Sequence, residues 1–283
     1  FLHYLLVFEF DILMGYAVAA IAAAFMVGRS DRFIKGAMWV SGGLHVVLAS
    51  LLFVVPLVLA PSEELARAPA DLYEAEAALV YTVGTWPEQV AYRLDNFLYY
   101  RSEAIGIIPM SIFLFLFGVR LMRAGAFADD ENGRRLRRKM LRWGLGVGVP
   151  LNLLAFVPES LFETPVRYLF APILSVGYIG LVALVFERGW MRWLFDRLAE
   201  VGRMALSCYV LQNVLASVVF YGWGLGLTGR VDSATTLGIL VGLFAVLALF
   251  ANLWLRRFAQ GPFEAVWRRL SLLPFKDPES NKT

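Results

Sequence analysis

The side chains best suited to acid–base chemistry in this 283-residue sequence are Asp11 and His45, which lie at the edge of or inside long runs without charge. His45 lies nine residues into the charge-free run 36–62, where a neutral imidazole could accept a proton from a substrate hydroxyl or act as a proton carrier. The alternative is an imidazole that is hydrogen-bonded to a neighbouring helix and takes no part in chemistry. Ionisable groups at membrane depth are energetically costly, so each one is a candidate functional residue.

Glu9 stands two residues before Asp11, and the position of both depends on where the first long helix begins. A start near residue 4 places both carboxylates inside the outer leaflet, whereas a start near residue 9 places them at the solvated end of the helix, where acidic side chains are favourable. Side chains two residues apart project about 200° apart on a helix, so these carboxylates are not a ready-made acid/base pair. We predict Asp11 as a catalytic residue and Glu9 as a substrate-binding residue.

A second group of polar residues lies in the most polar of the long apolar segments. Tyr209, Asn213 and Ser217 are spaced by four residues and form one stripe on a helix, and Gln212 lies on another side. Such groups either hold helices together through hydrogen bonds worth about 0.6 kcal/mol on average or line a substrate cavity. We carry Tyr209, Gln212 and Asn213 forward as candidate substrate-binding residues, together with Arg203 just before this segment.

Motifs of the common soluble enzyme classes are absent from the sequence. It has no P-loop, no HExxH, no CxxC, no GxSxG and no glycine fingerprint of a dinucleotide-binding domain. The single cysteine, Cys208, cannot form an internal disulfide and is expected to be a small packing residue. We therefore predict no metal site, and the sequence assigns no cofactor.

The distribution of charge determines the class of protein. Hydrophobic residues make up 59% and charged residues 17% of the chain, whereas soluble domains have about 45–50% and 25%. Seven stretches of 16 to 27 residues carry no charge, which is close to the roughly 20 residues that a helix needs to cross a bilayer. This pattern excludes a soluble globule, a disordered chain and a disulfide-rich secreted domain. We predict an all-α, polytopic transmembrane helical bundle with seven spans, near 9–28, 37–59, 104–122, 141–159, 166–186, 205–226 and 234–255.

The basic residues lie in alternate connections. Lys and Arg are dense after the first, third, fifth and seventh predicted spans and sparse in the connections between them. Because Lys and Arg are retained on the cytoplasmic side, residue 1 is expected outside and the C-terminus in the cytoplasm. The net charge of +3 then reflects basic inner loops against the anionic lipid of the bilayer, and it does not require nucleic acid as a partner.

Two shorter segments are expected to lie along the membrane surface. Thr85 and Glu88 form a capping-box pattern, in which Thr85 accepts from the backbone of Glu88, at the start of an interfacial helix over 86–100. Pro262 suits the first position of a second helix, over 262–271, which is basic and amphipathic.

The predicted domain organisation is simple. We expect a single transmembrane domain over 1–276, followed by a polar tail over 277–283. Phe1 opens inside an apolar run, so we also expect further residues, including more membrane spans, before it.

Three motifs in the sequence resemble a known family. They are Phe10-Asp11-Ile12-Leu13 with Gly15-Tyr16-Ala17, Gly202-Arg203-Met204-Ala205-Leu206-Ser207 with Tyr209, Leu211 and Gln212, and Phe258, Gly261-Pro262 and Glu264 with Trp267-Arg268-Arg269. Together they resemble the YeiB-like bacterial membrane family, also called domain of unknown function four-one-eight, over about residues 9–270. The chain has Ser207-Cys208 where that family typically shows Thr-Asn, so a side-chain amide is lost there.

The resemblance implies a multi-pass protein of the bacterial cytoplasmic (inner) membrane whose activity is not established. The family is distantly similar to the membrane acyltransferase superfamily, whose members transfer acyl groups to sugars or lipids. By that likeness we predict acyl transfer to an envelope glycan or lipid. Asp11 or His45 would act on the acceptor hydroxyl, and Arg203 with the stripe that contains Tyr209 and Asn213 would position an acyl donor.

Two other classes of function stay open. A small-molecule transporter would have a continuous wet path bordered by Glu9, Asp11 and Asn213. A non-catalytic interaction subunit would use the polar stripe entirely for contacts between helices. A lipid or an acyl donor is the ligand expected for the enzyme, and the sequence assigns no oligomeric state.

Overall fold

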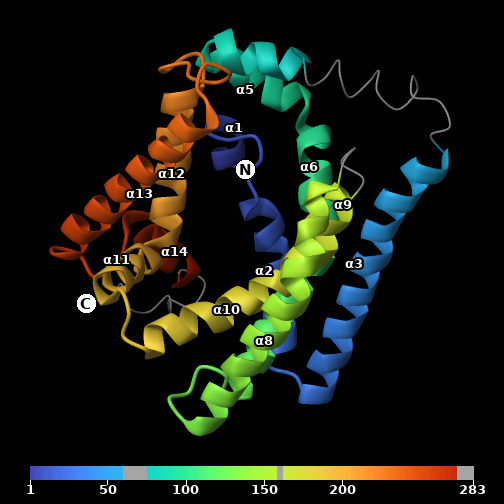
Figure 1. The fold of residues 1–283 in the computed structure, drawn as a ribbon. Coiled ribbons are helices and arrows are strands. Elements are labelled where there is room, and N and C mark those ends of the chain that lie inside the picture. The colour runs from blue at the N-terminus through green and yellow to red at the C-terminus, as the bar shows by residue number, and fades with distance from the viewer. Residues whose placement is uncertain (60–74, 158–161, 273–283) are drawn as a thin grey trace, which may run out of the picture. The chain divides into compact units, whose positions relative to one another are not determined.

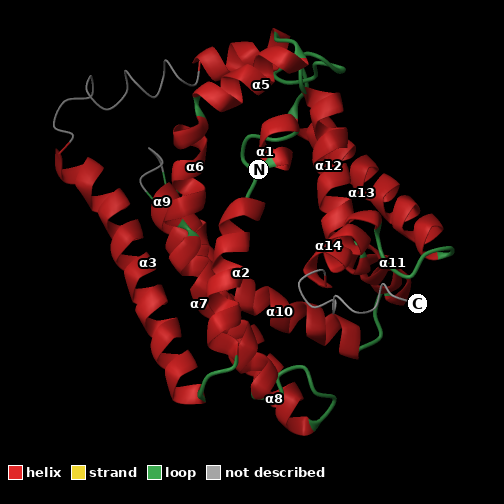
Figure 2. Ribbon diagram, turned by 180° about the vertical axis from the view of Figure 1, so that it is seen from behind, coloured by secondary structure: helices red, strands yellow, loops and turns green. Residues whose placement is uncertain are grey.

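A computed structural model describes residues 1–59, 75–157 and 162–272 of the chain. All regular elements in these ranges are helical and no strand occurs in them (Figure 1, Figure 2), which confirms the all-α prediction. The chain divides into two compact units. The first comprises Phe1–Glu9, Ala75–Asp95 and Met191–Thr283, and the second comprises Phe10–Glu74 and Asn96–Trp190. The predicted polar tail over 277–283 lies outside the described residues.

The second unit is built from long apolar helices. In chain order they are α2 (Leu13–Val27), α3 (Asp31–Leu59), α6 (Phe97–Gly106), α7 (Ile108–Arg123), α8 (Glu131–Leu153), the 3-10 turn Leu154–Phe156, α9 (Glu163–Pro165), the π-helical turn η3 (Val166–Phe170) and α10 (Ala171–Glu187). Helix α7 packs against both α2 and α3. Side chains from these three helices form a hydrophobic core that contains Ala23, Ile34, Met38 and Leu116.

Helices α8 and α10 form the most extensive helix pair of this unit. A methyl group added at Gly144 of α8 or at Gly177 of α10 would overlap the backbone of the other helix, and one added at Gly148 would press on α10 as well. Gly144 and Gly148 form a GxxxG pair, a pattern that permits close approach of helices, and α10 is the helix that approaches here. Nearby, the buried Arg137 of α8 forms an ion pair of 2.5 Å with Glu187 of α10.

The first unit contains the remaining helices. They are α1 (Leu2–Leu6), a helix over 75–83, α5 (Trp86–Asp95), α11 (Arg192–Arg203), α12 (Ala205–Phe220), α13 (Ser233–Leu255) and α14 (Pro262–Leu272). Its hydrophobic core lies where α12 packs against α13 and consists of Met204, Cys208, Leu247 and Ala251. The buried Cys208 is thus a packing residue, as its isolation in the sequence predicted.

Several helices begin at side chains that cap the helix or at a proline that suits its first position. Asp130 caps α8 by accepting from the Gly133 N–H at 2.6 Å, and Pro262 is the first residue of α14. Before α5, the Glu88 carboxylate accepts from the Thr85 N–H at 2.7 Å. The Thr85 hydroxyl also donates to this carboxylate, at 2.8 Å, although the capping-box pattern predicted it as an acceptor. These bonds hold the pKa of Glu88 below its ordinary value.

The helix predicted over 86–100 is divided in the structure. Helix α5 ends at Asp95, and Phe97 begins α6, which leads into α7 as part of one membrane-length segment. The apolar residues after Asn96 therefore belong to a candidate membrane crossing and not to the surface helix.

The predicted count of seven membrane spans is not confirmed. Helix α2 has 15 residues and is about 22 Å long, shorter than a hydrocarbon core of about 30 Å. Helix α8 has 23 residues, but its first half is charged. Helices α11 and α12, which are bent by 92° at their junction, add one more crossing to the four helices named next if the pair is counted as a single span. In the described part of the chain the helices long and apolar enough to cross a bilayer are Asp31–Leu52, Phe97–Arg123, Glu163–Glu187 and Ser233–Leu255.

The contact between α8 and α10 gives a direct test of the fold. Replacing Gly144 by Val forces a branched side chain into the backbone of α10, and overpacking of this kind costs about 1–3 kcal/mol. Gly146→Val is the matched control on the same helix, because a methyl group at Gly146 meets nothing within 4 Å. Thermal unfolding in detergent should show a lower Tm for Gly144→Val alone, and equal Tm values for the two variants would contradict the packing described above.

Candidate functional site

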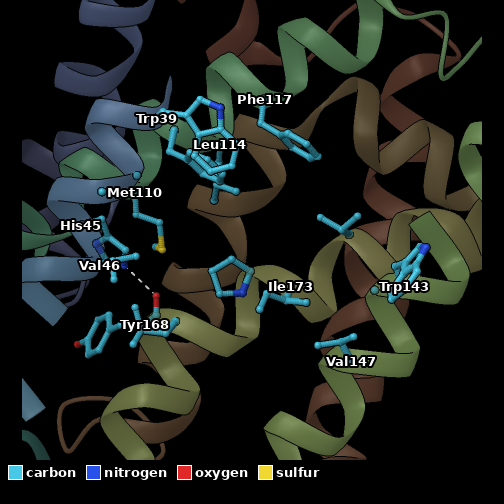
Figure 3. Close-up of a pocket in the computed structure, with 17 residues that line it drawn as sticks. Trp39, His45, Val46, Met110, Leu114, Phe117, Trp143, Val147, Tyr168 and Ile173 are labelled. Carbon is cyan, nitrogen blue, oxygen red and sulfur yellow. Dashed lines mark hydrogen bonds between the residues drawn. The ribbon is translucent and has the colours of Figure 1, made fainter. Parts of the chain in front are cut away.

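An apolar cavity of about 610 Å³ lies among α3, α7, α8 and α10 of the second unit. Cavities of this size commonly hold small ligands, and walls of aliphatic and aromatic carbon suit a hydrocarbon chain. Figure 3 shows His45 at one end of this cavity. The labelled residues around it include Trp39, Met110, Leu114, Phe117, Trp143, Val147 and Ile173.

His45 is the imidazole side chain that lines this cavity. It is only 7% exposed, and its Nε2 lies 2.8 Å from the backbone carbonyl oxygen of Tyr168 (Figure 3). A carbonyl oxygen can only accept, so Nε2 carries a hydrogen and the neutral ring has its lone pair on Nδ1. Within the described residues, Nδ1 is buried and has no hydrogen-bond partner. His45 therefore lines the end of an apolar cavity, and its second ring nitrogen has no partner among the described residues.

Tyr168 reaches His45 from an irregular turn. It lies in the π-helical turn η3, and such turns depart from the regular helical hydrogen-bond ladder and are frequent at functional sites. The turn joins α9 to α10, so the carbonyl that orients His45 is held by the helix pair α8 and α10. The sequence contains no signal for this turn, and Tyr168 is accordingly not among the predicted site residues.

A second cavity, of about 640 Å³, shares His45 and Tyr168 with the first. It is lined mainly by α3 and α6, and its polar groups include Ser102 and Glu103. The Glu103 carboxylate accepts from the Tyr168 hydroxyl at 2.9 Å and from the Arg167 guanidinium at 2.7 Å. His45 is thus bordered by an apolar cavity and by one with polar groups. No cluster of His, Cys, Asp or Glu that could hold a metal ion occurs in the described part of the chain.

Asp11, the other predicted catalytic residue, also belongs to the second unit. It is 1% exposed and precedes α2, and its backbone carbonyl accepts from the Arg101 guanidinium at 2.6 Å. Arg101 is buried as well. Asp11 is therefore held against α6, whereas His45 faces η3 from the middle of α3.

Glu9 lies in the first unit within a buried group of charged and aromatic side chains. The Tyr221 hydroxyl donates to its carboxylate at 2.6 Å, and the Arg93 guanidinium lies 3.6 Å away. The same guanidinium lies over the rings of Tyr81 and Tyr221, with 5.5 and 5.8 Å to the ring centroids. Charged groups at such depth are stable when they are paired in this way. Glu9 and Asp11 thus lie in a non-helical segment, and neither of the two predicted helix starts is found, since α2 begins at Leu13.

Neither Arg93 nor Tyr221 is among the predicted site residues. For Arg93 a signal does exist in the sequence. Val90, Arg93 and Phe97 are spaced by three and four residues, which places the arginine beside the apolar stripe of the helix predicted over 86–100. An arginine beside a buried stripe needs an acidic or carbonyl partner, and the structure supplies both, Glu9 and the carbonyl of Leu5 at 3.0 Å.

The polar stripe of α12 contacts the beginning of the chain. The Asn213 amide lies 3.3 Å from Nε2 of His3, and the Ser217 hydroxyl donates to the carbonyl of Val7 at 3.1 Å. The ring of Tyr209 packs on His3 with 5.2 Å between the centroids. The stripe therefore holds the segment around α1 in place, which favours the structural interpretation over the substrate-binding one.

The two other predicted binding residues of the first unit lie apart from this stripe. The Arg203 guanidinium donates to the carbonyl of Ala259 at 3.1 Å, so it links the end of α11 to the segment before α14. Gln212 lines a groove of about 480 Å³ between α12 and α13, which also contains Ser233 and Thr236.

Glu264 of α14 closes the start of α12. Its carboxylate accepts from the backbone N–H groups of Leu206 at 2.7 Å and Ser207 at 3.1 Å, and from the Ser207 hydroxyl. A helix start leaves such N–H groups without partners, so this carboxylate completes the bend between α11 and α12. Any side chain at Gly261 would collide with both Glu264 and Ser207. Burial alone would raise the pKa of Glu264, but the bonds from Ser207 and Leu206 lower it below its ordinary value.

The lowered pKa of Glu264 makes a pH-dependent contribution to stability. Because the folded pKa lies below the unfolded value of about 4.3, the stabilisation is fully present above that value and is lost as the pH falls through the folded pKa. Glu264→Gln should lower the free energy of unfolding by about 1 kcal/mol at neutral pH, and the difference should shrink below about pH 4. The measurement is Tm against pH, with Asp196→Asn on the exposed side of α11 as the control. A constant difference at all pH values would contradict this role.

Comparison with known proteins finds a family of unknown function and relatives that are described as uncharacterized. The family described as "Protein of unknown function (DUF418)" matches residues 121–274. The chain is 26% identical to the uncharacterized protein YxaH of Bacillus subtilis (strain 168), over 100% of this chain and 71% of that protein. It is 29% identical to the uncharacterized protein YeiB of Escherichia coli (strain K12), over 96% of this chain and 72% of that protein. No solved structure matches.

The family match covers more than half of the chain, and it includes the motifs around Arg203 and Glu264 that carry the resemblance seen in the sequence. The chain therefore belongs to the DUF418 family of YeiB-like proteins, a family of unknown function.

Proposed function

We propose that the protein transfers an acyl group to a hydroxyl group of an envelope glycan or lipid, with His45 as the general base. The observation that carries this proposal is the apolar cavity that ends at a buried imidazole whose Nδ1 has no partner among the described residues. An acyl chain fits the first cavity by its size and polarity. The second cavity, which shares this histidine, offers polar groups to the acceptor, among them Ser102 and Glu103.

The proposed reaction needs one proton to move at His45. Nδ1 accepts the proton of the acceptor hydroxyl while the oxygen attacks the carbonyl carbon of an ester or thioester donor. When the tetrahedral intermediate collapses, the bond to the leaving group breaks and the leaving oxygen or sulfur takes that proton from Nδ1. The Tyr168 carbonyl keeps its hydrogen bond to Nε2 throughout, so it fixes the tautomer and the orientation of the ring.

The other predicted site residues have different places in this proposal. Asp11 stays a second candidate for the acid–base role, since it is buried and ionisable. The contacts of Asn213 and Tyr209 with the start of the chain support a structural role for the α12 stripe, and we do not assign donor binding to it.

Membrane orientation is part of the proposal. We place the protein in the bacterial cytoplasmic membrane with residue 1 outside and the C-terminus in the cytoplasm. Basic residues support this arrangement, because they are concentrated around the start of α3, at the start of α8, in α11 and after α13.

The role of His45 can be tested with His45→Gln. Glutamine can still donate to the Tyr168 carbonyl, but it cannot accept a proton, so the fold should persist while acyl transfer falls by at least about 100-fold. The full-length protein would be reconstituted in vesicles of phosphatidylethanolamine and phosphatidylglycerol with radiolabelled acyl chains, or supplied with labelled acyl-coenzyme A. Label on diacylglycerol or on glucose oligosaccharides would be measured after chromatography.

Asn152→Ala serves as the matched control. Asn152 lies in α8, and within the described residues its side chain donates only to the carbonyl of Gly148 in its own helix, so its loss should leave the rate of transfer within about twofold. Acyl transfer by His45→Gln at the rate of the unaltered protein would contradict the proposal. The absence of labelled product from both donors would contradict it as well.

A further inference from the structure

The first half of α8 carries a row of exposed cations. Arg135, Arg138, Lys139 and Arg142 are all exposed, and within the described residues none of their side chains forms an ion pair with a carboxylate. They line a polar hollow of about 340 Å³ together with Glu131 and Arg134. Arg134 contacts Asp129 at 3.1 Å. An excess of positive charge thus remains at the hollow.

The cation on the inward face of the same helix, Arg137, has a structural role. Arg137 is buried, donates to the carbonyls of Ala126 and Ala128 at 2.7 and 2.9 Å, and forms the ion pair with Glu187. This arginine holds the start of α8 to the rest of the unit. The outward cations are not needed for that purpose, and they are free to bind an external anion.

The row of cations continues directly into the apolar cavity. Arg135, Lys139, Trp143 and Val147 follow one another at four-residue intervals, so each is a neighbour of the next on α8. Each step advances about 6 Å along the helix and turns about 40° around it. Trp143 and Val147 line the apolar cavity, and Trp143 is 72% exposed (Figure 3). The surface of α8 therefore presents cations, then an indole, then hydrocarbon along a path that winds gently around the helix.

We propose that this face of α8 binds an anionic glycerophospholipid. The phosphate lies in the hollow between Arg138, Lys139 and Arg142, the glycerol lies beside Trp143, and one acyl chain lies along Val147 at the mouth of the cavity. Guanidinium and ammonium groups bind phosphate by charge-assisted hydrogen bonds, and tryptophan favours the interface between headgroups and chains. A free phosphate would contact only the hollow. A lipid would contact both the cations of the hollow, with its phosphate, and the apolar residues of the cavity, with its acyl chain. This proposal does not depend on acyl transfer, because lipid binding can be measured without turnover.

The test is lipid binding by the full-length protein in detergent, followed by native mass spectrometry. Arg138→Gln/Lys139→Gln/Arg142→Gln should weaken the binding of phosphatidylglycerol by at least tenfold, since each cation near an anionic headgroup contributes. Arg29→Gln/Arg32→Gln/Lys35→Gln is the control, because it removes three exposed cations from the same unit outside the hollow, and its affinity should change less than twofold. Trp143→Ala should weaken phosphatidylglycerol and leave the binding of glycerol 3-phosphate unchanged.

Other measurements keep the proposal falsifiable if a variant does not fold. The unaltered protein should bind phosphatidylglycerol at least tenfold more tightly than phosphatidylcholine with the same chains, and more weakly as salt is raised. Equal binding of the two lipids, or an equal loss in the control variant, would overturn the site. Glycerol 3-phosphate bound as tightly as phosphatidylglycerol would identify a site for free phosphate instead. No binding of phosphatidylglycerol by the unaltered protein, with acyl transfer intact, would refute the lipid site alone. Selective binding of phosphatidylglycerol without acyl transfer would refute the proposed function alone.

Discussion

A polar group buried in apolar surroundings must find its partner within the protein, and this constraint decides where the charged side chains of this chain lie. The end of α1 illustrates it. The carbonyls there, which a helix cannot satisfy itself, each accept from a side chain of another helix: Arg93, Trp86 and Ser217 donate to Leu5, Leu6 and Val7. Glu264 does the same for the N–H groups at the start of α12. Most buried charged side chains in the described residues thus bond to backbone groups at places where helices end or break.

The same constraint separates structural polar groups from candidates for chemistry. Arg137 and Glu264 have their hydrogen-bonding capacity taken up by backbone groups and by oppositely charged or hydroxyl partners, so a substrate could reach them only by breaking those bonds. His45 differs, because one ring nitrogen is held by a carbonyl and the other is buried with no partner in the described part of the chain. Burial of an unsatisfied acceptor is unfavourable in the empty protein. A ligand hydroxyl that donates to Nδ1 would remove that penalty, which is why His45 is the stronger basis for a function.

Some of these features can be predicted from the sequence and others cannot, and the reasons are physical. Charge-free runs predict helices because only a helix satisfies its own backbone in hydrocarbon, and His45 is conspicuous because few polar groups interrupt those runs. The break before α2 is different. Glu9 and Asp11 stand in a short apolar context that suits a helix, and the groups that stabilise the break, Tyr221 and Arg101, lie far along the chain. The number of crossings depends likewise on helix lengths, which tertiary contacts set.

Tyr168 shows how one irregular turn can organise a site. Because it lies in a π-helical turn, its backbone carbonyl serves His45 while its hydroxyl donates to Glu103, which also holds Arg167. The residue thereby belongs to both cavities, and it links the imidazole to the polar groups beyond it. A carbonyl is well suited to orient a base, since it accepts from Nε2 whether or not Nδ1 has taken up a proton. The ring can therefore pass through a proton transfer without losing the contact that aims it.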